Sequence, residues 1–153
     1  MFRLLWFFVA MVPAVVLSDV SFVECPNGAP TPILLKINDC TADECILVSG
    51  QPISAIVSGI YSPIDSNTAK AHISSFVGGL DTGFEISPEL EDACSTGIDG
   101  GCPLTADVAF SYSLESNNLD VPARGVEVEV EIGLTGDGDV ELTCLRFKAI
   151  VNE

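Results

Sequence analysis

Apolar and polar residues alternate along several stretches of the chain, which is the pattern of β-strands with one buried and one solvated face. The clearest stretch is residues 126–134, where valine, isoleucine and leucine alternate with Glu127, Glu129 and Glu131. Long helical periodicity is hard to find. Alternating or β-branched stretches also occupy residues 33–38, 45–50, 51–61, 69–80, 108–114 and 140–151. About seven to nine short strands at this spacing predict an all-β chain, an antiparallel β-sandwich.

A hairpin is expected between the last two stretches, because residues 136–139 read Gly-Asp-Gly-Asp. If Thr135 pairs with Val140, Glu129 lies opposite Arg146 and the apolar faces of both strands coincide, so we adopt this register as a hypothesis. The Asp-Gly-Asp run resembles calcium ligands. It lacks the loop glycine and the closing bidentate glutamate of an EF-hand, which favours a plain turn.

Six cysteines predict three disulfides, although six cysteines allow about 15 pairings in principle. Two pairs are close enough to meet across small loops, which leaves one pair to join the ends of the domain. A zinc site is the competing interpretation, but Cys-x4-Cys and Cys-x7-Cys with a single histidine match no usual ligand spacing. The expected pairs are Cys25 with Cys144, Cys40 with Cys45 and Cys94 with Cys102.

Residues 1–18 predict a secretory signal peptide, because Arg3 precedes an apolar run that ends in Val16-Leu17-Ser18. The run contains Pro13 and is short for a membrane span. Residues 19–153 would then form one domain. The single tryptophan of the chain, Trp6, would leave with the signal peptide.

The chain is strongly acidic, with 22 Asp and Glu against 6 Lys and Arg and a formal net charge of −16. This charge disfavours nucleic acid and anionic membranes as partners. The one histidine, His72, has no Gly-x-Ser-x-Gly nucleophile motif to serve, and no phosphate-binding motif occurs. We therefore expect no enzyme activity, no cofactor and no metal. The apolar strand faces then form either a closed core or a cavity for an apolar guest.

The cysteine order, the Cys102-Pro103-Leu104 sequence, the aromatic stretch at 109–114 and the final Cys144 together resemble the Niemann-Pick type C2 family of ML lipid-recognition domains. That family includes group 2 mite allergens and secreted arthropod lipid carriers, and the resemblance spans residues 19–153. It implies an immunoglobulin-like sandwich of two sheets with an internal hydrophobic ligand cavity. It also implies the same three disulfide pairs.

The resemblance implies a lipid site as well. The Cys94–Cys102 loop is expected at the cavity mouth, with the following strand lining the cavity; the alternative is that its aromatic residues fill a closed core. Apolar positions before Cys94 and around Pro122 are expected to contact a sterol. The expected lipid-binding residues are Phe84, Val108, Phe110, Tyr112, Leu119 and Val121.

The function implied is a secreted, monomeric carrier of a sterol or similar hydrophobic lipid, with a membrane lipid acceptor protein as a further partner. The alternative is a lipid-recognition module for a fatty acid or semiochemical, or an innate-immune lipid co-receptor. Co-receptors of lipid A need basic residues at the cavity rim, and the lysines and arginines here are dispersed. No Asn-x-Ser/Thr sequon occurs, so we expect secretion rather than glycan-directed lysosomal sorting.

Overall fold

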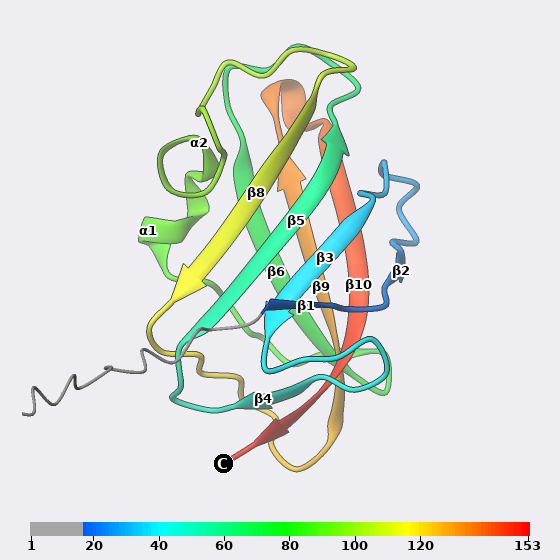
Figure 1. Cartoon of the computed structure of the whole chain (residues 1–153), viewed down its shortest axis with the longest axis vertical. Helices are drawn as coiled ribbons and strands as arrows, with labels where there is room; N and C mark the ends of the chain where they lie inside the picture. The colour runs from blue at the N-terminus through cyan, green and yellow to red at the C-terminus, as the bar shows by residue number, and fades with distance from the viewer. Residues whose placement is uncertain (1–16) are drawn as a thin grey trace, which may run out of the picture.

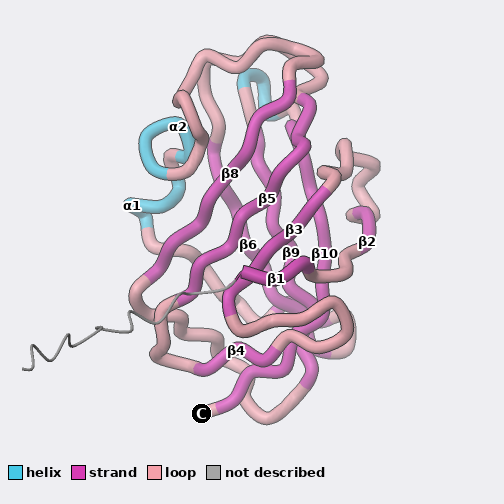
Figure 2. The backbone as a smooth tube through the Cα atoms, viewed as in Figure 1, coloured by secondary structure: helices cyan, strands magenta, loops and turns pink. Residues whose placement is uncertain are grey.

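Two β-sheets face each other in the structure, a computed structural model that describes residues 17–153 (Figure 1). The expected signal peptide, residues 1–18, lies almost wholly outside the described residues. Strands and connecting loops make up nearly all of the described chain (Figure 2). Within residues 17–153, no helix is long and apolar enough to cross a membrane. The expected all-β sandwich of two antiparallel sheets with three disulfides is confirmed.

The first sheet has four strands in the order β1-β3-β5-β8, and every neighbouring pair is antiparallel. These strands are β1 (Leu17–Asp19), β3 (Leu34–Asn38), β5 (Ile53–Tyr61) and β8 (Ala109–Ser116).

The second sheet has six strands in the order β2-β10-β9-β6-β7, with β4 added in parallel beside the end of β10. These strands are β2 (Val23–Glu24), β4 (Ile46–Val48), β6 (Lys70–Val77), β7 (Leu80–Asp81), β9 (Glu127–Thr135) and β10 (Glu141–Asn152). Two short helices, α1 (Pro88–Glu91) and α2 (Ala93–Thr96), lie between β7 and β8, and a 3₁₀ turn, η1 (Asp137–Asp139), joins β9 to β10.

The predicted register of the last hairpin is wrong by two residues. Arg146 lies opposite Glu131 rather than Glu129, because the loop spans residues 136–140 and a bulge between Glu141 and Thr143 adds a further offset. A shift of two residues keeps every side chain on its own face, so the apolar stripe of β9 still points inward. Arg146 also still reaches Glu129, since its guanidinium lies 2.8 Å from that carboxylate and 2.7 Å from Glu131.

The core is solid in the half of the sandwich next to the 136–140 loop, which we call the packed half. Large side chains from both sheets fill it, and each is at most 1% exposed. Their number and size leave the two sheets in direct contact there. The packed half contains Leu35, Ile60, Tyr112, Leu134 and Leu142.

The three disulfides join the expected cysteines. Cys25–Cys144 links residues 119 apart and holds residues 25–30 along the edge of β10, where the Cys144 N–H donates to the Pro30 carbonyl at 3.0 Å. Cys40–Cys45 closes the turn between β3 and β4, and Cys94–Cys102 ties α2 to the chain that leads into β8.

Candidate functional site

A cavity of about 220 Å³ lies between the two sheets, beyond the packed half. We call this part of the sandwich the hollow half. Strands of both sheets supply its walls, and most of the wall residues are aliphatic or aromatic. They include Ile37, Ile53, Ile73, Leu114, Val130 and Phe147.

The strands that build the packed half also form the cavity walls. On β8, Tyr112 is buried in the packed half, whereas Leu114 and Ser116, the next residues on that face, line the cavity. On β9, Leu134 belongs to the packed half and Ile132 lines the cavity. Small inward side chains leave the space open, since Ala55, Ser75 and Ser116 lie in the cavity wall.

One side of the cavity mouth is formed by the segment from Gly83 to Ser87 and by α1, which supply Phe84, Ile86 and Leu90. The segment has a local turn at each end: the Gly83 N–H donates to the Asp81 carboxylate at 2.7 Å, and the Leu90 N–H donates to the Ser87 carbonyl at 2.9 Å. Among the described residues, Phe84, Glu85 and Ile86 make no backbone hydrogen bond to another segment. Side-chain packing alone therefore holds this wall in place.

The opposite side of the mouth, residues 116–121, is fixed by its backbone. The Gly50 N–H donates to the Leu119 carbonyl at 2.8 Å, and the Leu119 N–H donates to the Gln51 carbonyl at 3.2 Å. Ser116 Oγ donates to the Asn118 carbonyl at 3.1 Å. The mouth thus has one rigid side and one side without backbone support.

The polar groups of the cavity are few. Ser75, only 1% exposed, satisfies its hydroxyl against Thr82, so the interior wall presents no unpaired polar group there. The ionisable lining residues are Glu85 and Asp120, both at the mouth. This arrangement suits a guest with an apolar body and a small polar end.

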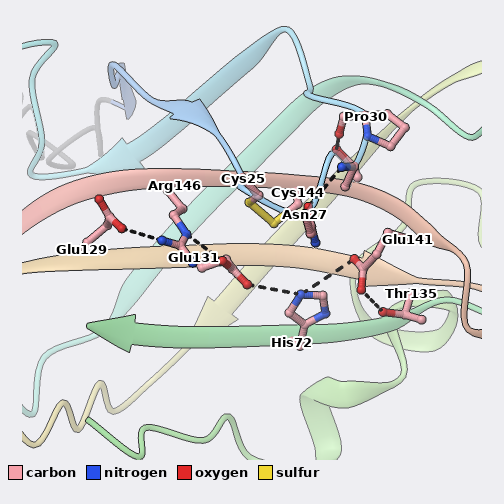
Figure 3. Close-up of a disulfide and its surroundings, with 12 residues drawn as sticks. Cys25, Asn27, Pro30, His72, Glu129, Glu131, Thr135, Glu141, Cys144 and Arg146 are labelled. Atoms are coloured by element: carbon pink, nitrogen blue, oxygen red, sulfur yellow. Dashed lines mark hydrogen bonds and ion pairs between the residues drawn. A yellow bond between two sulfur atoms is a disulfide. The ribbon is translucent and has the colours of Figure 1, made fainter. Parts of the chain in front are cut away.

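His72 lies outside the cavity, on the outer face of the six-stranded sheet (Figure 3). Its Nε2 atom is 3.8 Å from Glu131 and 3.9 Å from Glu141, and its ring packs where a Cβ on Gly133 would collide with it. His72 therefore faces two carboxylates on the side of β6 opposite the cavity.

The Cys25–Cys144 sulfurs lie near the Glu131 carboxylate, a grouping that superficially resembles a metal site (Figure 3). The two sulfurs are bonded to each other, so they offer no thiolate ligand. The grouping is a disulfide beside an ion pair.

The structure brings half of the sequence-predicted lipid-binding residues together. Phe84, Leu119 and Val121 line the cavity, whereas Val108, Phe110 and Tyr112 do not. Val108 precedes β8 and is 56% exposed, and Tyr112 is enclosed in the packed half, where burial raises its pKa to about 12.

The Cys94–Cys102 loop also lies away from the cavity lining, against the edge of β8. The Ser113 N–H donates to the Gly97 carbonyl at 2.9 Å, and the Asp99 N–H donates to the Ser111 carbonyl at 3.3 Å. Gly97 is required by this contact, because a Cβ there would lie 2.5 Å from the Ser113 carbonyl oxygen. The loop covers a sheet edge, which protects unpaired strand groups.

The chain is similar in sequence to one protein family and in fold to two solved structures. The family model for the ML domain matches residues 19–151. A Niemann-Pick type C2 protein from Japanese carpenter ant superposes with a TM-score of 0.60 at 14% identity, over 96% of this chain and 100% of that one. Chicken MD-1, complexed with lipid IVa, superposes with a TM-score of 0.55 at 13% identity, over 88% of this chain and 96% of that one. No curated protein sequence matches the chain.

Proposed function

Because the chain belongs to the ML domain family, whose members are lipid-binding proteins and not enzymes, we propose that it carries a hydrophobic lipid between its two sheets. The observation that carries the proposal is the apolar cavity of about 220 Å³. Binding there needs no covalent step, so the protein would solubilise its lipid and hand it to an acceptor. The lipid IVa bound by chicken MD-1 supports the idea of a lipid guest in this fold.

Burial of apolar surface supplies the binding energy. A guest that hides ~400 Å² of apolar surface gains on the order of 10 kcal/mol at roughly 25 cal/mol/Å². Association costs about 4 kcal/mol at the least, so about 6 kcal/mol remains at most, which corresponds to a dissociation constant of tens of micromolar.

The cavity size bears on the kind of lipid. Ligand pockets typically hold about 300–1,000 Å³, so a cavity of 220 Å³ requires a wall to move outward before a sterol fits. The segment from Gly83 to Ser87 can do so without breaking backbone hydrogen bonds to other segments. We propose a sterol or another lipid with one long apolar body as the guest.

The three disulfides indicate an oxidising compartment, either extracellular or the lysosomal lumen. We propose secretion, directed by residues 1–18, with residues 19–153 as the mature monomer; this cleavage would remove Leu17 and Ser18 and leave only Asp19 of β1. The proposed acceptor is a membrane lipid protein, which would receive the guest through the cavity mouth.

The test is a binding experiment with the mature chain. A fluorescent sterol is added, and cholesterol or oleic acid then competes for it; the single tryptophan lies at residue 6, so protein emission from residues 19–153 stays low. Displacement by cholesterol alone identifies a sterol carrier, and displacement by oleic acid identifies a broader lipid carrier. Absence of binding by all three ligands would remove the proposal.

A pair of variants ties the signal to the cavity. Ala55 faces the cavity and Ser54, its neighbour on β5, faces the other side of the sheet. Ala55→Phe should fill the cavity and weaken sterol binding about tenfold or more, whereas Ser54→Phe should leave it unchanged. Equal effects of the two substitutions would show that the sterol binds elsewhere.

A further inference from the structure

The charged residues that line the cavity mouth are all acidic. Glu85 on the unsupported side and Asp120 on the fixed side are its ionisable members, and neither lysine, arginine nor histidine belongs to the described lining. Both carboxylates are exposed, so they meet the polar end of any amphiphile whose tail enters the cavity. The mouth therefore presents negative charge to the ligand's head group.

Neighbouring basic side chains offset this charge only partly. The Arg124 guanidinium lies 3.8 Å from Asp120, with both side chains substantially exposed, and Lys70 lies 3.4 Å from Glu91 of α1. Glu85 forms no ion pair among the described residues, and Glu89 adds a further acidic group on α1. Glu85 is thus the uncompensated charge at the mouth.

The apolar wall behind Glu85 strengthens its effect on a ligand. The low-dielectric cavity wall beside the exposed carboxylate focuses its electric field toward the opening. An ammonium head group would be attracted at the opening. A carboxylate or phosphate head group would be repelled and would also lose part of its hydration.

We propose that the cavity selects amphiphiles with a positively charged head group over anionic ones of the same chain length, and that Glu85 is the main determinant of this selection. The inference rests on the proposed function, since it concerns ligands of the same cavity. A long-chain amine is the best ligand class, a neutral alcohol such as a sterol is intermediate, and a fatty acid or a phosphorylated lipid is the weakest.

The experiment compares three competitors that share one C18 chain and differ in the head group. Oleylamine, oleyl alcohol and oleate each displace the fluorescent sterol from residues 19–153 at pH 7.4, below their aggregation concentrations. We expect oleylamine to act at about tenfold lower concentration than oleate, with oleyl alcohol between them. Raising the salt concentration from 20 mM to about 500 mM should reduce the amine-to-oleate ratio, because screening weakens interactions between exposed charges.

Variants then locate the selecting group. Glu85→Gln should lower the amine-to-oleate ratio about threefold and leave oleyl alcohol binding unchanged. Glu24→Gln on β2 makes the same change in net charge away from the cavity lining, and it should leave the ratio as in the wild type. A ratio that changes equally in both variants would overturn the role of Glu85.

The variant Ala55→Phe distinguishes binding inside the cavity from non-specific adsorption of an amine to the acidic protein. This variant should lose oleylamine binding together with sterol binding; because no sterol is left to displace, oleylamine binding is measured directly by isothermal titration calorimetry, and oleylamine bound as tightly as to the wild type would overturn the inference. If oleate displaces the sterol as well as oleylamine does, the inference fails while the proposed function stands. If no lipid binds, the proposed function itself fails.

Discussion

The packed half and the hollow half are built from the same strands and the same alternation, yet one is solid and the other holds a cavity. On β3, Leu35 is enclosed in the packed half and Ile37, the next inward residue, lines the cavity. On β8, Tyr112 and Leu114 differ in the same way. Alternation decides which face of a strand points inward, and the sizes of the inward side chains in each layer decide whether the interior is filled.

The largest expected effect comes from the Cys25–Cys144 disulfide, which ties the chain ends that both halves share. Replacing both cysteines by alanine should lower the free energy of unfolding by about 5 kcal/mol in the loop-entropy model, because the bond closes a long loop. Replacing Cys40 and Cys45, a short loop beside the hollow half, should cost only about 2 kcal/mol. Urea unfolding followed by far-ultraviolet circular dichroism measures both, and equal losses would contradict the model.

A pair of leucines tests the two halves directly. Leu134→Ala in the packed half should lower the free energy of unfolding by about 4 kcal/mol, because a new void forms among tightly packed neighbours. Leu114→Ala should cost about 2 kcal/mol, since its side chain already borders an open space. The same urea experiment applies. Equal costs would mean that the interior is equally well filled in both halves.

The packed half can also be tested at alkaline pH, through the effect of the buried Tyr112 phenol on the free energy of unfolding. Burial in the packed half raises the pKa of this phenol to about 12, so the stability that it contributes is complete below pH 10 and is lost as the pH rises toward 12. The loss should reach roughly 2–3 kcal/mol at high pH. Tyr112→Phe should remove this part of the alkaline decline, whereas Tyr61→Phe, at an exposed tyrosine, should retain it. Urea unfolding between pH 9 and pH 12 reports the difference.

The smallest effect is expected at Asp137, in the loop that closes the packed half. The Asn67 backbone N–H donates to its carboxylate at 2.9 Å and the Thr68 hydroxyl at 2.6 Å, and these hydrogen bonds hold the pKa of Asp137 below its ordinary value of 3.8. Its stabilising contribution is therefore present above pH 3.8 and is lost as the pH falls through the lowered pKa.

Asp137→Asn should consequently lower the melting temperature at pH 7, and the difference from the wild type should shrink as the pH falls below 3.8 and through the lowered pKa. Asp120→Asn, in the loop at the mouth of the hollow half, serves as the control, because no hydrogen bond to its carboxylate is present among the described residues. A pH-independent difference for Asp137→Asn would show that the carboxylate charge is not involved.

Much of the fold could be predicted because its signals are local. The alternation at 127–134 marks a half-buried strand, and two short cysteine spacings leave one way to pair the rest. The hairpin register could not be predicted, since the bulge after Glu141 has no distinct sequence mark and a two-residue shift preserves both faces.

The position of the cavity is harder to predict from the sequence than the strands are, because an inward residue looks the same in a solid core and in a cavity wall. The family resemblance predicts Phe84, Leu119 and Val121, which lie in the wall, and it equally predicts Phe110 and Tyr112, which lie one or two layers too early on β8. A usable signal was present in the inward positions of small residues. Ser75 and Ser116 interrupt otherwise apolar stripes where the sheets enclose the cavity.

The lack of backbone bonding at Phe84, Glu85 and Ile86 also affects how the protein can evolve. No strand pairing depends on these residues, so substitutions there change the wall and the charge of the mouth while the sandwich keeps its register. Ligand preference can therefore drift without the loss of stability that core mutations bring. In the laboratory, a library that varies the three residues between Gly83 and Ser87 would vary the bound ligand while the rest of the sandwich stays the same.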